Sequence, residues 1–148
     1  MFEPPRGAGA RKHDVLRRLH HDVDLWAATA GRLHLIPLSF VWYRSEVVLA
    51  TAASSRTVRN VRTCNELRLA LGHPRDVVLI EATALTVPAE SAAEDMVTAF
   101  HMKTGFDPRL EPAPQHFILA TPRNIRAWRE ENELAGRDVM LDGVWTSV

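Results

Sequence analysis

Residues Leu33 to Asn60 read LHLIPLSFVWYRSEVVLATAASSRTVRN, and this stretch is the most informative part of the sequence. Two of its segments, 33–43 and 46–51, are rich in β-branched and aromatic residues, and the polar pair Arg44-Ser45 separates them. Apolar runs on both sides of a short polar connection are typical of antiparallel strands joined by a tight turn. The two segments are therefore expected to pair in one sheet.

The end of the same stretch predicts a basic helix that runs to about residue 63. Ser54, Ser55 and Thr57 are all residue types that cap helix N-termini well. Arginine then recurs at every third position, at 56, 59 and 62. Free N–H groups and the helix dipole favour anions at a helix start, so the segment predicts a phosphate site. The spacing leaves a second interpretation open, a solvated basic face behind an ordinary serine cap.

The rest of the chain predicts more strands, two more helices and no strand–helix–strand alternation. Apolar runs predict strands over residues 23–30, 67–71, 77–87 and, with an interruption at Pro122, 116–128. Amphipathic spacing predicts helices over 11–21 and 90–104, and the second is expected to cover one end of a barrel. This succession favours a mainly β protein, an antiparallel barrel with flanking helices.

Proline 37 marks a special point in the strand over 33–43. A proline has no N–H to donate to a neighbouring strand. Pro37 is therefore expected at a sheet edge, at a bulge, or where a ligand replaces the neighbouring strand. The residues alone do not choose between a simple edge and a ligand site.

The bulk composition predicts one soluble domain. The chain has 148 residues, of which 46% are hydrophobic and 24% charged, enough to bury a sizeable core. Residues 1–10, rich in Pro, Gly and Ala, are expected to be a flexible N-terminus before one domain over 11–148. Basic and acidic residues balance at 18 each, so nucleic-acid and membrane partners are not expected. A single cysteine and the lack of a signal-like run predict a cytoplasmic protein.

Several kinds of catalytic site have no support in the sequence. The seven histidines lack the paired spacing of a metal site. Cys64 has no positioned base nearby in sequence and is expected to be a small buried side chain. Nucleotide-binding glycine motifs and a nucleophile elbow are also missing. An anion site without a nucleophile, a metal or an obvious general base points to chemistry carried by an organic cofactor, most simply redox chemistry.

Four aromatic residues raise the question of a second subunit. We expect exposed aromatic side chains at Trp42, Tyr43, Trp128 and Trp145, which a partner subunit would cover. In the alternative interpretation, each of these rings packs in the core of its own chain.

Three segments resemble one known family. DLWAATAGRLHLIPLSFVWY, VVLATAASSRTVRN and RLALGHPRDVVLIEATA are similar to the pyridoxamine 5′-phosphate oxidase-like split-barrel family, especially its flavin and deazaflavin oxidoreductase branch. The similarity spans roughly residues 23–145. It implies a six-stranded antiparallel split barrel, a homodimer, and cofactor sites between the subunits. The hydride carrier would be FMN or a deazaflavin, coenzyme F420. The chain lacks the C-terminal Arg-x-His pattern of the true pyridoxamine phosphate oxidases, so that activity is not expected.

The resemblance also assigns cofactor-binding residues. Those that would line the ring are Pro37, Leu38 and Ser39. Those that would wrap the phosphate are Thr51, Ser54, Ser55, Arg56 and Thr57, supported by Arg59 and Asn60. Trp145 would reach toward the cofactor of the partner. One position departs from the family pattern, since Thr57 stands where many relatives carry a lysine.

Three functions remain open on this sequence. The first is a homodimeric oxidoreductase that passes hydride from reduced FMN or deazaflavin to a small conjugated acceptor. The second is a flavin or related ligand-binding carrier without turnover, and the third is a cofactor-free structural dimer. No catalytic residue is assigned. His34 and Tyr43 are candidates to protonate a product, although a packed or surface role is favoured for each.

Overall fold

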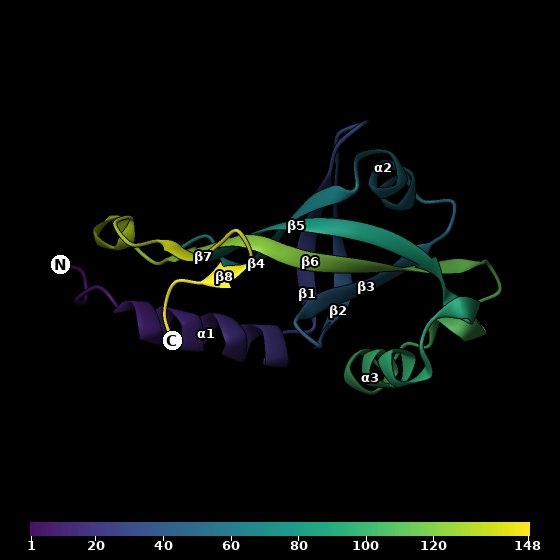
Figure 1. Cartoon of the computed structure of the whole chain (residues 1–148), viewed down its shortest axis with the longest axis horizontal. Helices are drawn as coiled ribbons and strands as arrows, with labels where there is room; N and C mark the ends of the chain where they lie inside the picture. The colour runs from purple at the N-terminus through teal and green to yellow at the C-terminus, as the bar shows by residue number, and fades with distance from the viewer.

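Six antiparallel strands close into a barrel in the computed structural model, which describes residues 1–148. They follow one another in the order β3, β2, β1, β4, β5 and β6, and β6 pairs with β3 to close the ring (Figure 1). The prediction of a mainly β, six-stranded antiparallel barrel with flanking helices is confirmed. The strands are β1 (Asp24–Thr29), β2 (His34–Tyr43), β3 (Glu46–Ala52), β4 (Glu66–His73), β5 (Asp76–Pro88) and β6 (Gln115–Trp128).

Local sequence explains the tight connections between the strands. Arg44 and Ser45 both have positive φ angles, 49° and 62°. Positive φ at both central residues of a two-residue hairpin turn suits the right-handed twist of the flanking strands. The turn between β4 and β5 is shorter than predicted, because β4 continues to His73 and β5 begins at Asp76.

The predicted interruption at Pro122 is a β-bulge inside one continuous strand. Glu81 of β5 faces Asn124, and the next residue, Ala82, faces Pro122. Arg123 therefore has no partner and is the extra residue of the bulge. The bulge lets β6 bend while it pairs with β5 over nearly its whole length (Figure 1).

The helices differ from the prediction mainly at their starts. The helix α1 (Ala8–His21) begins three residues before the expected start at Arg11. The helix α2 (Arg56–Cys64) agrees with the predicted basic helix, whereas α3 (Glu94–Thr104) starts later than residue 90 because residues 89–91 form a 3-10 turn. None of these helices has the length and apolar character needed to cross a lipid bilayer.

The C-terminal segment, residues 130–148, contains secondary structure that the sequence did not predict. Two short strands, β7 (Asp138–Leu141) and β8 (Val144–Trp145), form a hairpin. β7 pairs with β6, so the hairpin extends the sheet beyond the barrel. A 3-10 turn at Glu131–Glu133 precedes this hairpin, and another, at Pro108–Leu110, lies between α3 and β6.

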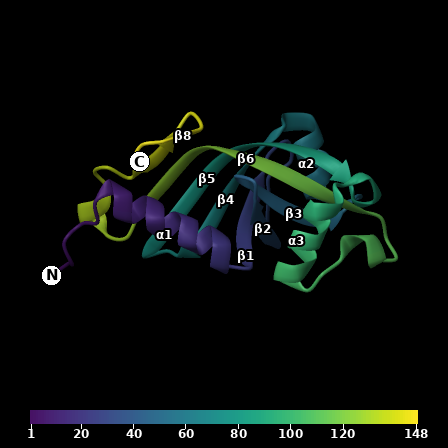
Figure 2. The same ribbon diagram turned by 60° about the horizontal axis from the view of Figure 1, so that its bottom comes forward.

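Two helices contribute apolar side chains to the barrel interior, and the third packs against the outer wall. The interior cluster of 22 buried residues includes Val15 of α1 and Val58 and Val61 of α2. A second cluster of eight joins Phe100 of α3 to outward-facing residues of the barrel wall, among them Val48. The helix α3 thus covers the outer wall and not an end of the barrel, as Figure 2 shows, which corrects the expectation.

The four aromatic residues pack within their own chain. Trp42 and Trp145 lie against the interior cluster, and Tyr43 lies against the outer cluster. Trp128 is also partly buried. The prediction of exposed rings at these positions is wrong, because all four are partly buried and three of them pack against a hydrophobic cluster of their own chain. The exposed aromatic ring of the barrel is Trp26, at 50% exposure.

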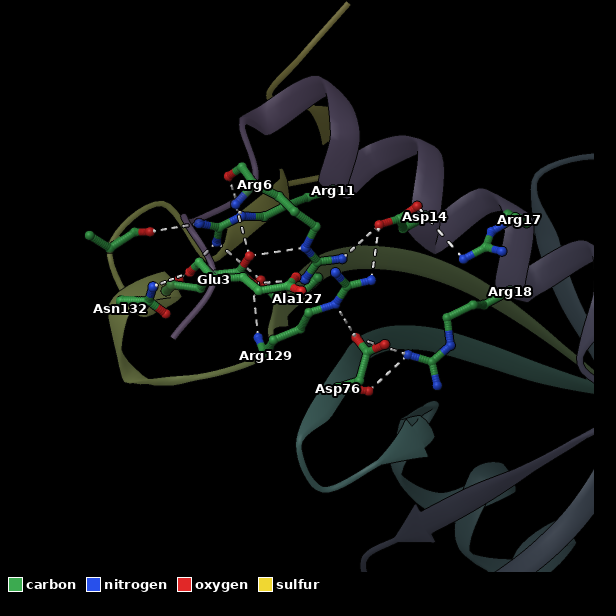
Figure 3. A network of polar contacts seen from close by, with 12 residues as sticks. Glu3, Arg6, Arg11, Asp14, Arg17, Arg18, Asp76, Ala127, Arg129 and Asn132 are labelled. Carbon is green, nitrogen blue, oxygen red and sulfur yellow. Dashed lines mark hydrogen bonds and ion pairs between the residues drawn. The ribbon is translucent and has the colours of Figure 1, made fainter. Parts of the chain in front are cut away.

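A chain of alternating charges ties the N-terminus and α1 to the end of the barrel (Figure 3). Its ion pairs run in the order Glu133, Arg6, Asp14, Arg129, Asp76, Arg18 and Asp22, with N–O distances of 2.8 to 3.6 Å. The Arg6 guanidinium is the main cause that lowers the pKa of Glu133 to about 2. This chain fixes segments that local sequence leaves independent.

Candidate functional site

Four arginines line one hollow between α2 and the turn that joins β1 to β2. We call it the arginine hollow; its volume is about 590 Å³. Arg32 comes from the turn, while Arg56, Arg59 and Arg62 lie one after another along α2. No hydrophobic residue lines the hollow, whose other lining residues are Gly31, Asn60 and Thr63.

These four arginines have no acidic partners. None of them has a carboxylate oxygen within 4.0 Å, whereas nine of the twelve other arginines in the chain form ion pairs. Burial and then the nearby charges of Arg59 and Arg32 lower the pKa of Arg56. The side chains therefore repel one another, and an anion placed among them would relieve that repulsion.

The start of α2 adds backbone donors beside the hollow. The Ser55 hydroxyl accepts a hydrogen bond from the Val58 amide at 3.2 Å and is the N-cap, as predicted. The amides of Arg56 and Thr57 begin the helix and have no carbonyl partner within it. Ser54, just before the cap, is exposed. An anion at this point would meet amide donors and guanidinium groups together.

Thr57 points away from the hollow. Its side chain is fully buried, at 0% exposure, and its hydroxyl has no hydrogen-bond partner. This is the position where the resemblance leads one to expect a lysine. The chain therefore has no long cation at this position, and the positive charge comes from the arginines of the exposed face.

Asn60 holds the fourth arginine in place. The buried Asn60 amide donates to the Thr29 hydroxyl at 2.9 Å and to the Arg32 carbonyl at 2.6 Å, and its oxygen accepts from the Arg32 amide at 3.3 Å. Gly31 has φ +113°, and a Cβ there would lie 3.1 Å from the Asn60 oxygen. Asn60 thus positions the turn. The sequence prediction missed Arg32 because only this contact brings the turn to α2.

The first half of β2 has a free edge. Residues 34–39 pair with β1, but β2 pairs with β3 only from Phe40 to Tyr43. The Phe40 amide donates to the Val23 carbonyl at 2.9 Å. Because backbone direction alternates along a strand, Leu35, Pro37 and Ser39 turn their backbone polar groups to the free side. Pro37 therefore lies at a sheet edge, one of the predicted options, where its missing N–H breaks no ladder bond.

The side chains of the predicted ring-binding residues point in different directions. Leu38 packs against the interior cluster. The Ser39 hydroxyl donates to Asp24 at 2.6 Å, and Pro37 is exposed. A ligand along this edge would meet the backbone of residues 35–39 more than their side chains.

The structure does not bring Trp145 to the arginine hollow within one chain. Trp145 lies in β8 with Lys12 over its ring at 5.3 Å, and β8 and α2 lie well apart in both ribbon views (Figures 1 and 2). Thr51 lies in β3 opposite His116 of β6. Burial, followed by the charge of Arg62, lowers the pKa of His116.

The remaining reactive groups are not gathered into a second site. Cys64 is exposed and donates to the Ala30 carbonyl at 3.3 Å, which corrects the expectation that it is buried. Arg44 lies over the Tyr43 ring at 5.2 Å, and His34 is half-buried. No group of three or more His, Cys, Asp or Glu side chains is placed to hold a metal ion.

The outer wall of the barrel carries an apolar groove of about 290 Å³. Trp26, Leu35 and Leu79 are its exposed apolar residues, at 50%, 63% and 40% exposure. Leu35 also belongs to the free edge of β2. The groove therefore borders the edge that the ring is expected to occupy.

The chain is similar to known proteins in structure, although not detectably in sequence. No protein-family model and no curated protein matches it. A Listeria innocua protein described as a candidate pyridoxamine 5′-phosphate oxidase superposes with a TM-score of 0.65 at 14% identity, covering 80% of this chain and 98% of its own. The chain has the split-barrel fold of the pyridoxamine 5′-phosphate oxidase-like proteins.

Other structures with the same split barrel carry different names. An F420 reductase superposes with a TM-score of 0.60 at 13% identity, over 82% of this chain and 97% of its own. The haem storage protein of Vibrio cholerae gives 0.63 at 14% identity, over 79% of this chain and 94% of its own. Identities this low establish the split barrel alone.

Proposed function

We propose that this split barrel binds FMN or a deazaflavin and transfers hydride to a small conjugated acceptor. The arginine hollow carries the proposal, because four arginines without acidic partners stand beside the capped start of α2. The free edge of β2 begins just after the turn that carries Arg32, since Arg32 lies two residues before His34 in the chain. An anionic group and a ring of one cofactor would thus find neighbouring places.

The residues present fit such a cofactor. Guanidinium groups and first-turn amides are strong donors to phosphate oxygens. Along the free edge, residues 35 and 39 each offer an N–H and a carbonyl, whereas Pro37 offers a carbonyl alone. This edge suits a planar heterocycle with both donors and acceptors on its rim.

When bound, FMN or deazaflavin supplies the hydride chemistry, and the protein supplies binding and orientation. Arg56, Arg59 and the amides at the start of α2 would hold the phosphate. The Ser55 cap fixes the start of α2, and the Asn60 contacts keep the turn that carries Arg32 beside it. The backbone of residues 35–39 would orient the ring at the barrel wall.

A homodimer is part of this proposal. The apolar groove leaves Trp26, Leu35 and Leu79 in contact with water, and a second copy over this wall would cover them. It would also exclude water from a ring at the free edge of β2, which limits side reactions of a bound hydride carrier.

One observation favours a second function on the same fold, a flavin or related ligand carrier without turnover. The buried Thr57 side chain gives no contact where the family often uses a lysine, so a bound phosphate has one cation fewer. Loss of the cofactor altogether would leave a structural dimer.

Absorbance and mass spectrometry of the purified protein test the proposal directly. A bound flavin or deazaflavin, or uptake of either with a micromolar or better dissociation constant, is the expected result. Oxidation of the reduced cofactor by an added conjugated acceptor then separates the oxidoreductase from the carrier. A colourless protein that takes up neither cofactor would contradict both.

A further inference from the structure

The amine of Lys103 lies between α3 and the end of α1. It donates to the Leu19 carbonyl at 3.0 Å and lies 4.0 Å from the centre of the Phe40 ring. The Leu19 carbonyl is one of the last four of α1, which have no partner within the helix. Leu19 and Phe40 are fully buried, whereas the Lys103 side chain is partly exposed. The helix α3 lies well apart from α2 in both ribbon views, so this amine is separate from the arginine hollow (Figures 1 and 2).

Burial of this amine favours its unprotonated form. No carboxylate oxygen lies within 4.0 Å of it. Burial lowers the pKa of Lys103 to about 8, against a smaller opposite effect from the charge of Asp22. A free lysine amine is unprotonated in about one molecule in a thousand near pH 7.4, and a pKa of about 8 raises this share to about one in five. The neutral amine can still donate to the Leu19 carbonyl and so keep its position.

We infer that Lys103 is a site of acylation by small activated acyl compounds, such as acyl phosphates or thioesters. The lone pair of Nζ attacks the acyl carbon and forms a C–N bond, while the bond from that carbon to oxygen or sulfur breaks. The phosphate or thiolate leaves with the electron pair of that bond, and the nitrogen releases one proton to water. The amide product is uncharged, which suits a partly buried position, and its remaining N–H can donate to the Leu19 carbonyl.

The test treats the full chain with acetyl phosphate and follows each amine by peptide mass spectrometry. Lys12 is the internal control, because it is the other lysine of the chain and also donates to a carbonyl, that of Ser147, at 3.2 Å. Lys12 lies against the partly exposed Trp145 and not against a fully buried ring. At pH 7.5, Lys103 should be acetylated about tenfold or more faster than Lys12 and than a short peptide with one lysine. Its rate should level off above about pH 8.

Asp22→Asn provides a second measurement, since the charge of Asp22 opposes the loss of a proton from Lys103. This variant should raise the acetylation rate of Lys103 about twofold or more at pH 7 and leave that of Lys12 unchanged. Asp95→Asn is the matched control, at an exposed acid near the start of α3, and should change neither rate. An equal effect of both variants would contradict the role given to Asp22 and overturn the inference.

Three further results would overturn it. One is an equal rate at Lys103 and Lys12. Another is a rate at Lys103 no faster than in the short peptide, because the Phe40 ring would then hold the amine as the ammonium ion. The third is acetylation of Lys103 only when urea unfolds the chain, since the amine would then be out of reach in the folded protein. None of these results depends on cofactor binding.

Discussion

Arg59 and Asn60 are neighbours in the sequence with opposite places in the structure. Arg59 lines the arginine hollow on the exposed face of α2, and Asn60 is buried on the other face. Successive helical residues differ by about 100° in direction, which separates the two side chains. One residue offers charge to a ligand while the next holds the turn that carries Arg32.

Removal of the Asn60 amide should therefore lower the free energy of unfolding. Asn60→Ala deletes three hydrogen bonds and leaves the buried Thr29 hydroxyl without a partner. We expect a loss of about 2–3 kcal/mol in the free energy of unfolding, measured with urea. Asn132→Ala, which removes an exposed bond to the Glu3 carbonyl, should cost less than about 0.5 kcal/mol. Equal losses in both variants would contradict the role given to Asn60.

Arg56 is the arginine nearest the start of α2. Arg56→Ala should raise the dissociation constant of the cofactor by about 5- to 150-fold, as for the loss of a charge-assisted hydrogen bond. Titration of FMN or deazaflavin into the purified protein measures the change, and Arg17→Ala provides the control. An unchanged dissociation constant would place the phosphate elsewhere.

Glu133 should make stability depend on acid pH. Its pKa falls from 4.5 to about 2, chiefly through the hydrogen bond from Arg6. The contribution of a carboxylate with a lowered pKa is complete above its ordinary pKa and is lost as the pH falls through the folded value. Glu133→Gln should thus cost about 3 kcal/mol near neutral pH and flatten the decline of stability below about pH 5.

Urea unfolding across this pH range checks the prediction. The exposed Glu131 gives a matched control, because Glu131→Gln removes a carboxylate from the same 3-10 turn. An acid decline in Glu133→Gln as steep as that of the unaltered protein would contradict the assignment.

At the scale of elements, β2 shows that the effect of a proline on stability depends on whether its backbone nitrogen faces a neighbouring strand or a free edge. The amide position of Pro37 faces the free side, whereas that of Leu38 faces β1. Pro37→Ala should change the free energy of unfolding by less than about 1 kcal/mol, since it restores no ladder bond. Leu38→Pro should cost about 3 kcal/mol or more, because it removes one. Comparable stability of the two variants would show that residues 34–39 are paired otherwise.

The segments that sequence patterns missed lack a local signal. β7 and β8 are only four and two residues long, and pairing with β6 supplies the bonds that keep them extended. The start of α1 also depends on distant residues. Buried Arg11 donates to the carbonyls of Ala127 and Glu133, which lie near the other end of the chain. In both cases a distant partner decides a local conformation.

At the scale of the whole molecule, the apolar groove should be an interface. The protein should be a dimer in solution, and Trp26→Glu should shift it to the monomer, because a charge would then replace the ring at the groove. Light scattering after size exclusion measures both states. Leu110→Glu, at an isolated exposed leucine on another face, should leave the dimer intact. A monomer for the unaltered chain would refute the dimer.

Local sequence patterns predict the six strands of the barrel, the turn at Arg44-Ser45 and the capped basic helix, and the resemblance predicts the split barrel. These features follow from local periodicity, turn chemistry and helix capping, which neighbouring residues supply. Long-range contacts pair β3 with β6, bury Thr57, and bring Arg32 beside Arg56 through Asn60, and no local pattern predicts them. Such contacts join residues that are distant along the chain, and they form only when the barrel closes and buries the groups that pair.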